Sequence, residues 1–122
     1  MELQQCVNSS VCLREEKAKV VVGLRGPSAN IFVDNAAYRD FLFHNFKVSS
    51  SDMASSAVVM ISLSNGFSVI VIRGLSDLAG KQKGQNAIDT FGSLSAFNTA
   101  KVVLQFLKEL PPKLLLNSSF KP

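Results

Sequence analysis

The amino-acid sequence predicts an α/β fold of which this chain supplies a part. Residues 67–80 carry a run of β-branched side chains, Val69, Ile70, Val71 and Ile72, followed by a polar turn. A continuous apolar run of this kind is typical of a strand that is covered on both faces. Helical and extended segments alternate around it, and about three strands are expected, too few for a complete doubly wound sheet. We therefore expect the end of a larger α/β domain.

The first part of the chain predicts two extended segments. Residues 1–18 are polar and irregular, and a strand is expected over residues 19–24. Gly26-Pro27-Ser28 ends that strand, because proline has no N–H to donate to a ladder. A shorter extended piece follows at residues 30–33.

Two helices are expected next. Asp34 or Asn35 can cap a helix that runs to about Phe46, since their side-chain oxygens accept an N–H of the first turn. A second helix is expected over residues 53–64, and it is apolar almost all round, which predicts that it is well buried. Asn65-Gly66 tolerates the left-handed conformation that ends helices.

The last helix is expected after the strand at residues 67–72 and an irregular loop over residues 74–89. Asp89 or Thr90 can cap it, and Pro111-Pro112 stops it. Its expected core stripe is Phe97, Ala100, Leu104 and Leu107. The sequence thus divides into an irregular segment (residues 1–18), a domain portion (residues 19–110) and a loose tail (residues 111–122).

Composition favours a chain whose surface is covered by something else. Hydrophobic residues make up 47%, charged residues 18%, and the mean hydropathy is +0.21. The charged fraction lies below the usual quarter. Either a partner subunit or another part of the same domain would cover this apolar surface. Such a composition also argues against disorder.

The charge pattern excludes nucleic acids as partners, and the hydropathy pattern excludes a membrane. The net charge is +4, but the basic residues are scattered and no basic stripe alternates with stacking aromatic residues. No apolar run reaches the roughly 20 residues that span a bilayer. The first ten residues lack the basic and apolar regions of a signal peptide.

Cys6 and Cys12 are the only cysteines of the chain. They either form a short-loop disulfide, in an oxidising compartment, or remain two free thiols. Two sequons begin at Asn8 and Asn117, and together with the cysteines they leave a secretory or vacuolar ancestry open. A metal site is not expected, because the cysteines lack the spacing of ligands and His44 is the single histidine.

A candidate site lies at the turn after residues 67–72. Asp77 follows the expected strand, with Ser76 beside it, at the end of a sheet where ligands bind in open α/β folds. Phe32 and Val33 could form an apolar slot, and Met53 opens a helix whose first amides are free to face a ligand. A carboxyl group in an apolar cleft suits proton donation. On spacing alone, a turn or cap aspartate is the commoner role for Asp77.

Three ordered motifs weigh against that plain interpretation. They are SANIFVDNAAYRDFL, SSDMASSAVVMISLSNG and VIVIRGLSDLAG. In this order they resemble the C-terminal half of the nucleoside phosphorylase superfamily, and especially its plant branch of bark and vegetative storage proteins. The resemblance covers about residues 20–110. It implies a three-layer α/β/α fold with a mixed central sheet, here a partial domain.

The resemblance also implies a reaction and a set of roles. Members of the family cleave the N-glycosidic bond of nucleosides with phosphate or water. Asp77 falls at the acid that protonates the leaving base, and Ser76 lies next to it. Phe32 stacks on the base, Val33 bonds it through the backbone, Met53 packs on the ribose, and Ile88 lies near another apolar position that closes over the ligand. The implied ligand is a purine nucleoside or an analogue, with phosphate as an optional co-substrate and no cofactor or metal.

The chain departs from the family pattern in two ways. The family has Met-Glu where this chain has Met53-Ala54, and alanine cannot accept hydrogen bonds from the ribose hydroxyls. Each lost charge-assisted bond could cost about 1.5–3 kcal/mol of sugar binding. Asp52 is a poor substitute, since on a helix start it points about 100° away. The family's N-terminal half, with its phosphate-binding loop, is also not recognisable here.

Two hypotheses follow, and a third interpretation is kept beside them. The first is a truncated nucleoside phosphorylase or nucleosidase type of protein, inactive in isolation and marginally folded. The second is a non-catalytic storage protein on the same fold, whose site has decayed. The third is an unrelated binding module with a coincidental motif. A homo-oligomer is compatible with each of them.

Overall fold

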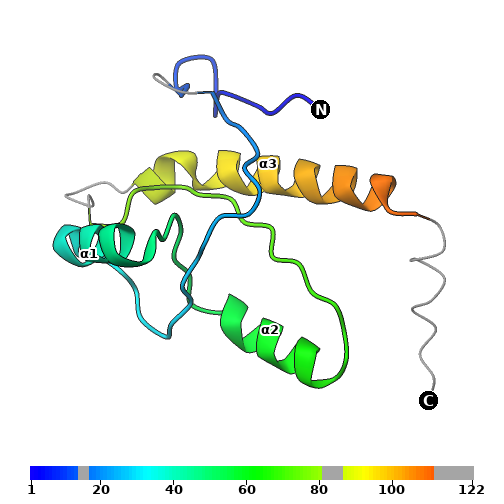
Figure 1. Ribbon diagram of the computed structural model, residues 1–122. Helices are drawn as coiled ribbons and strands as arrows, with labels where there is room; N and C mark the ends of the chain where they lie inside the picture. Colours follow the sequence, from blue (N-terminus) through cyan, green and yellow to red (C-terminus); the bar gives the residue numbers. More distant parts are fainter. Residues whose placement is uncertain (14–16, 81–86, 112–122) are drawn as a thin grey trace.

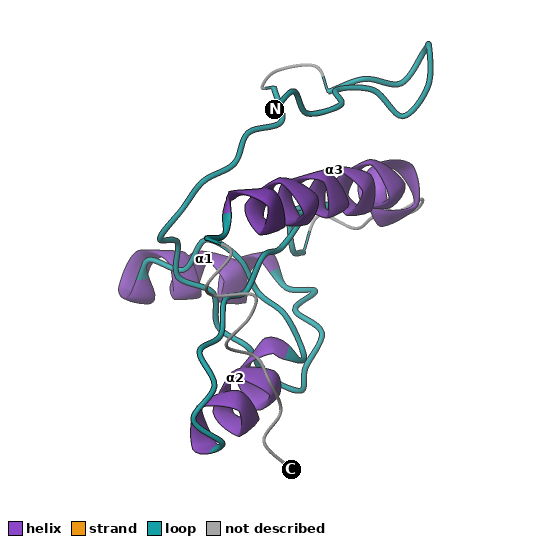
Figure 2. Ribbon diagram, turned by 90° about the vertical axis from the view of Figure 1, so that its right-hand side faces the viewer, coloured by secondary structure: helices purple, strands orange, loops and turns teal. Residues whose placement is uncertain are grey.

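The computed structural model describes residues 1–13, 17–80 and 87–111, with backbone alone for residues 87–89. Three helices form within this part: α1 (Ala36–Phe46), α2 (Ser55–Ser64) and α3 (Ala87–Glu109). In Figures 1 and 2, α3 lies on one side of a layer of extended chain, and α1 and α2 lie on the other. The predicted tail beyond residue 111 and residues 81–86 of the predicted loop lie outside the described residues.

Helix α1 confirms the prediction from its capping residue. The Asn35 side-chain oxygen accepts a hydrogen bond from the Tyr38 backbone N–H at 2.9 Å. Such a cap stabilises a helix by about 1 kcal/mol. At the other end, Lys47 adopts a left-handed conformation with φ 56°, and its N–H donates to the Phe43 carbonyl. The helix therefore begins and ends where local chemistry predicts.

Helix α2 begins two residues later than expected, and it is not buried. The Asp52 carboxylate accepts from the Ser55 N–H, with both oxygens at 3.3 Å, and this bond fixes the start of the helix. Gly66, at φ 77°, follows its end as predicted. No residue of α2 is buried, and Met60 is 64% exposed. The predicted burial is wrong in this chain because no element of the described part covers the outer face of the helix.

Helix α3 begins at Ala87, before either predicted cap. Its predicted core stripe is wrong: Phe97, Leu104 and Leu107 are exposed, whereas Leu94 and Asn98 are buried. The reason is the position of the N-terminal segment, which lies against the Leu94 face. Asn98 donates to the Gln4 carbonyl and accepts from the Gln4 N–H, both at 2.8 Å.

The predicted strands do not form in the described residues, as Figure 2 shows. Residues 67–72 are extended, but they pair with no neighbour there, so the predicted double-sided burial is also wrong: Ile70 is 60% exposed. Residues 19–24 and 30–33 likewise carry no strand. A strand needs a ladder partner as well as a β-branched sequence. The described residues contain only isolated bridges, joining Cys6 with Cys12, Arg25 with Val48 and Ser28 with Asp52.

The N-terminal segment folds into a small loop closed by a disulfide between Cys6 and Cys12. Backbone bonds flank the disulfide, from the Val7 N–H to the Val11 carbonyl at 2.8 Å and from the Leu13 N–H to the Gln5 carbonyl at 2.9 Å. Of the two alternatives for the cysteines, the structure therefore has the disulfide.

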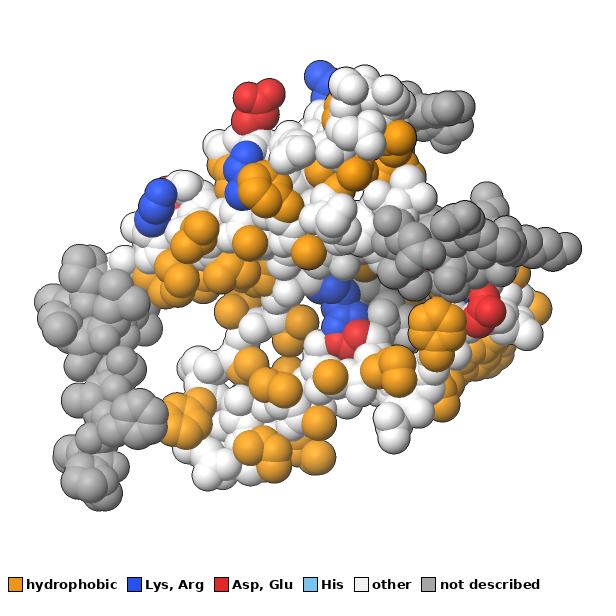
Figure 3. Space-filling view, turned by 180° about the vertical axis from the view of Figure 1, so that it is seen from behind, with side chains coloured by type: hydrophobic (Ala, Val, Ile, Leu, Met, Phe, Trp, Pro, Cys, Tyr) orange, Lys and Arg blue, Asp and Glu red, His pale blue; other side chains and the backbone are white. Residues whose placement is uncertain are grey.

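Apolar side chains remain on the surface of every helix. Within the described residues Leu94 is the single buried hydrophobic residue, at 4% exposure. Figure 3 shows apolar side chains spread over the rear face and an opening between its upper and lower parts. This agrees with the composition, which predicted surface to be covered. No helix of the described part is long and apolar enough to cross a membrane.

Candidate functional site

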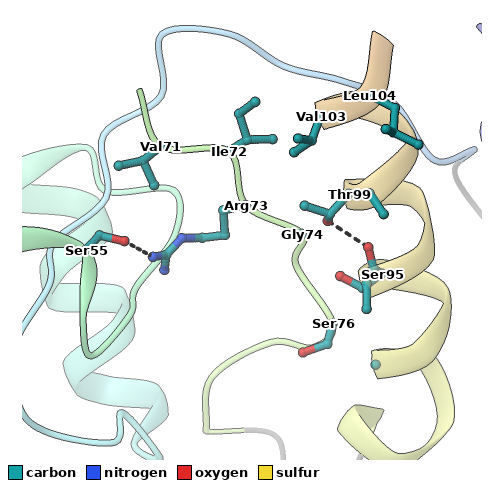
Figure 4. Close-up of a pocket in the computed structure, with 13 residues that line it drawn as sticks. Ser55, Val71, Ile72, Arg73, Gly74, Ser76, Ser95, Thr99, Val103 and Leu104 are labelled. Atoms are coloured by element: carbon teal, nitrogen blue, oxygen red, sulfur yellow. Dashed lines mark hydrogen bonds between the residues drawn. The ribbon is translucent and has the colours of Figure 1, made fainter. Parts of the chain in front are cut away.

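An open groove lies between the extended chain after residue 70 and helix α3. Its walls come from three elements, as Figure 4 shows: the start of α2, residues 71–76, and one face of α3. The lining residues are Ser55, Val71, Ile72, Arg73, Gly74, Ser76, Gly92, Ser95, Ala96, Thr99, Ala100, Val103 and Leu104. The groove thus combines an apolar end with a second end that carries hydroxyl groups and one guanidinium.

Gly74 brings the extended chain into contact with α3. A Cβ at this position would lie 2.8 Å from the Ser95 carbonyl oxygen and closer still to the hydroxyls of Ser95 and Thr99. Real Cβ atoms do not approach so closely, so a larger residue would push the chain away from the helix. The absence of a side chain at Gly74 therefore sets the width of the groove.

Arg73 anchors the same chain to the start of α2. Its guanidinium forms an ion pair with the Asp52 carboxylate, and Nη2 donates to the Ser55 hydroxyl at 2.7 Å. The Ser55 hydroxyl also bonds the Asp52 carboxylate. The side chains of Arg73 and Asp52 are 22% and 16% exposed, so the pair is largely shielded from water. Burial lowers the pKa of Arg73. The ordinary pKa of arginine is so high that the side chain nevertheless remains charged at neutral pH.

Asp77 lies at the end of this chain with a fixed hydroxyl partner. The Ser76 Oγ donates a hydrogen bond to Asp77 Oδ1 at 2.5 Å, and both residues are half-buried. This bond orients the carboxylate. A carboxyl group can accept or donate one proton.

The loop that carries Asp77 is held against α1. Arg39 Nη1 donates to the Ala79 carbonyl at 2.7 Å, and Gly80 lies against the start of α1 with φ 77°. A Cβ on Gly80 would lie 2.6 Å from the Asn35 carbonyl carbon. These two contacts, at the adjacent residues 79 and 80 that follow Asp77, hold this end of the loop against α1.

The other predicted site residues lie apart from the groove. Phe32 is 60% exposed, Met53 is 52% exposed and Val33 is half-buried. Ser76 is the one predicted site residue that lines the groove. The backbone of Ile88 belongs to α3, and its side chain lies outside the described part. The structure thus brings together Ser76 and Asp77, whereas Phe32, Val33 and Met53 do not line the groove.

The prediction of free amides at the start of α2 is wrong. The Ser55 N–H donates to Asp52, and the Ser56 N–H donates to the Ser28 hydroxyl at 3.1 Å. Both first-turn donors already have partners in this protein, so they do not face a ligand. The geometry also corrects the prediction for Asp52: it precedes the helix, and its carboxylate turns toward Arg73.

Three residues of the site were missed at the level of sequence. Arg73 and Asp52 form the ion pair, and Arg39 holds the Asp77 loop. An arginine directly after an apolar run was a usable signal for Arg73, because a charge at the end of a buried strand needs a partner. Nothing in the sequence indicated the Arg39 contact. The described part contains no group of three or more His, Cys, Asp or Glu side chains placed to hold a metal ion.

Comparison with known proteins agrees with the family resemblance of the three sequence motifs. The sequence profile of the phosphorylase superfamily matches residues 2–108. Bark storage protein A of Populus deltoides is 36% identical over 111 residues, which is 91% of this chain and 34% of the relative. Bark storage protein B of the same species is 35% identical over the same length. The chain therefore spans about a third of the length of these relatives. No solved structure matches the chain significantly.

Both comparisons extend over nearly the whole chain, including the stretch from the Arg73 anchor to the Asp77 loop. The profile begins before the disulfide loop and ends near the end of α3. This chain belongs to the phosphorylase superfamily.

Proposed function

We propose that this chain is part of a nucleoside phosphorylase or nucleosidase type of protein that takes a purine nucleoside or an analogue and is inactive in isolation. The observation that carries this proposal is the Ser76–Asp77 pair, an acid oriented by a hydroxyl beside an open groove. The loop contacts to α1 hold this acid in place. Family membership supports the reaction class.

The chemistry that we assign to Asp77 is protonation of the leaving base. When the N-glycosidic bond breaks, the ribosyl fragment gains positive charge and the base gains negative charge. A carboxyl group that gives its proton to a ring nitrogen neutralises the base as it leaves. The bonding electrons pass to the base, and phosphate or water adds to the sugar carbon. The Ser76 hydroxyl orients the carboxyl group for this transfer.

Inactivity in isolation follows from what the site lacks. Ala54 offers no acceptor for the sugar hydroxyls, and Asp52 is already paired with Arg73. Phe32 and Met53 lie exposed, so these two side chains form no apolar wall around a base and a sugar. An open groove also admits water, which weakens the electrostatic effects that catalysis uses. Phosphate, if it is the co-substrate, would need a binding loop from another part of the protein.

The finer fold assignment belongs to the same proposal. Membership in the superfamily implies an α/β fold, while the described residues contain helices and no strand. We infer a three-layer α/β/α domain with a mixed sheet, in which residues 19–24 and 67–72 supply strands. The domain portion would then be residues 19–110, with flanking segments at residues 1–18 and 111–122.

The test is release of base from nucleosides by the purified chain. Inosine, adenosine and uridine are incubated with the chain, each with and without phosphate, and free base is separated by chromatography. We expect no release above buffer. Release that disappears in the matched variant Asp77→Asn would contradict the inactivity, and it would assign the acid directly.

A non-catalytic storage protein on the same fold is the second candidate. The names of the two relatives and the alanine at position 54 favour it. Restoring the carboxylate with Ala54→Glu in a full-length form of the protein separates the two. Recovered nucleoside binding, measured by calorimetry, indicates a decayed enzyme. Binding that stays absent favours storage.

A further inference from the structure

The loop that the disulfide closes carries a sequon that the proposed function does not use. Asn8, Ser9 and Ser10 form the pattern Asn-x-Ser, and all three residues are exposed. They lie between Cys6 and Cys12. A sequon accepts an N-linked glycan on a surface loop of a protein that passes through the secretory pathway. The structure of this loop is therefore the evidence on which such a role depends.

The groups of the sequon that take part in glycosylation have no competing contacts. The Asn8 side-chain oxygen accepts from the backbone N–H of Ser10 at 2.9 Å and from that of Val11 at 3.0 Å. Within the described residues, the Asn8 amide nitrogen and the Ser10 hydroxyl form no hydrogen bond. The amide nitrogen is the atom that a glycan joins, and the hydroxyl is the second fixed element of the sequon. A glycan on this nitrogen therefore breaks no contact of the described chain.

The loop lies at the outside of the molecule. Figure 1 shows the N-terminal segment, in dark blue, beyond α3 on the side away from α1 and α2, and Figure 2 shows the same order from another direction. The segment is attached to α3 by residues that precede the loop. Gln4 pairs with Asn98, and the Glu2 carbonyl accepts from Lys101. These contacts do not involve Asn8, so the attachment to α3 can persist when the loop carries a glycan.

The disulfide is a second observation that points to the same compartment. Disulfides persist in the secretory pathway and outside the cell, and they are rare in the cytosol. N-linked glycans belong to proteins of the same pathway. The bond between Cys6 and Cys12 involves no atom of the sequon, so the two features agree independently. Together they favour a glycosylated loop over a sequon that occurs by chance.

We propose that Asn8 is an N-glycosylation site and that the folded protein carries this glycan together with the Cys6–Cys12 disulfide. The donor is an oligosaccharide carried on a lipid pyrophosphate. Asn8 Nδ2 forms a bond to the anomeric carbon of the oligosaccharide, the bond from that carbon to the phosphate oxygen breaks, and its electron pair leaves with the pyrophosphate. One Nδ2 proton passes to a base of the transferase, and nothing is oxidised or reduced. The proposal does not depend on nucleoside chemistry.

The experiment directs the whole 122-residue chain into the secretory pathway of eukaryotic cells by a cleavable signal peptide placed before Met1. The variant Asn117→Gln leaves the sequon at Asn8 as the single one of the chain. A glycan gives a slower electrophoretic form, which peptide-N-glycosidase converts to the faster form. Mass spectrometry of the non-reduced peptide then reads the converted residue and the disulfide together. The total cell extract is analysed without nucleoside, so the result is separate from the base-release assay.

We expect the slower form to be the major product and to disappear in Asn8→Gln and in Ser10→Ala. Ser10→Ala keeps the backbone N–H that bonds Asn8, so its effect reports the lost hydroxyl and not a lost turn. The matched variant Ser10→Thr keeps a hydroxyl and should retain the glycan. Far-UV circular dichroism should be the same before and after enzymatic removal of the glycan.

Three results would overturn the proposal. The first is a chain that has lost its signal peptide and carries no glycan at Asn8, with or without the disulfide. The second is a glycan on Asn117 alone when that residue is restored. The third is a glycan at Asn8 that occurs only on molecules whose cysteines are free thiols, because the glycan and the closed loop would then exclude each other.

Discussion

The Asp52–Arg73 pair offers a sharp test of the geometry around the groove, because two substitutions at position 52 separate its two roles. Asp52 accepts from the Ser55 N–H at the start of α2, and it also pairs with the Arg73 guanidinium. Asp52→Asn keeps an oxygen for the Ser55 N–H and removes the charge. Asp52→Ala removes both.

The exposed fractions set the expected magnitude. At 16% and 22% exposure, the pair lies between a surface pair, worth about 0–1 kcal/mol, and a buried one, where loss of a partner costs about 3–5 kcal/mol. We therefore expect the charge to contribute about 1–2 kcal/mol. The hydrogen bond from the Ser55 N–H adds about 1 kcal/mol, so Asp52→Ala should cost about 2–3 kcal/mol.

The assay is hydrogen exchange of the amides in the last turns of α2, at residues 59–64. Since 1.4 kcal/mol corresponds to about tenfold, exchange should accelerate by about 5–30-fold in Asp52→Asn and by about 30–150-fold in Asp52→Ala. Exchange in α1, which has its own cap at Asn35, should not change and serves as the internal control. Equal exchange in the parent chain and in Asp52→Ala would refute the assigned geometry.

Three further predictions concern the contacts that hold the flanking segments. Reducing the Cys6–Cys12 disulfide should lower the stability of the loop that it closes by about 2 kcal/mol on the chain-entropy estimate. Faster hydrogen exchange at residues 7–13 measures this loss, while the circular dichroism of the helices should stay constant. A change in helicity would contradict the prediction. Asn98→Asp keeps the acceptor for the Gln4 N–H but loses the donor to the Gln4 carbonyl, at a cost of about 1–3 kcal/mol. Limited proteolysis of the N-terminal segment should therefore accelerate by about fivefold or more, and unchanged cleavage would argue against this contact. Gly80→Ala places a Cβ against the start of α1 at a positive φ, and should lower the stability of the Asp77 loop by at least about 1 kcal/mol. Hydrogen exchange at residues 77–80 should become faster. Unchanged exchange would refute the close approach of Gly80 to α1.

The sequence predicted the helices well because their signals are local. Asn35 caps α1 through a bond to a residue three positions later, and Gly66 ends α2 by its own backbone preference. The strands were predicted from the same kind of local pattern, but a strand forms only with a partner. At residues 67–72 the described chain provides none, so the β-branched run remains extended and unpaired.

The candidate site could be predicted in part for the same reason. Ser76 and Asp77 are neighbours in sequence, and their hydrogen bond follows from that adjacency. The Arg39 contact joins residues 40 positions apart, and the Arg73 contact with Ser55 joins residues 18 positions apart. Such contacts depend on how the helices pack, which no local pattern encodes. The core stripe of α3 was wrong because the N-terminal segment, and not the α3 pattern, decides which face is covered.

The central proposal is that this chain forms part of a phosphorylase-superfamily domain and does not bury a complete hydrophobic core by itself. Differential scanning calorimetry of the monomeric chain tests it most directly. A self-sufficient domain of 122 residues would unfold in one sharp transition with an enthalpy of about 85 kcal/mol. With Leu94 as the single buried hydrophobic residue of the described part, we predict a broad transition with a small fraction of that enthalpy. A sharp transition of the full enthalpy, in a chain shown by light scattering to be monomeric, would contradict the account.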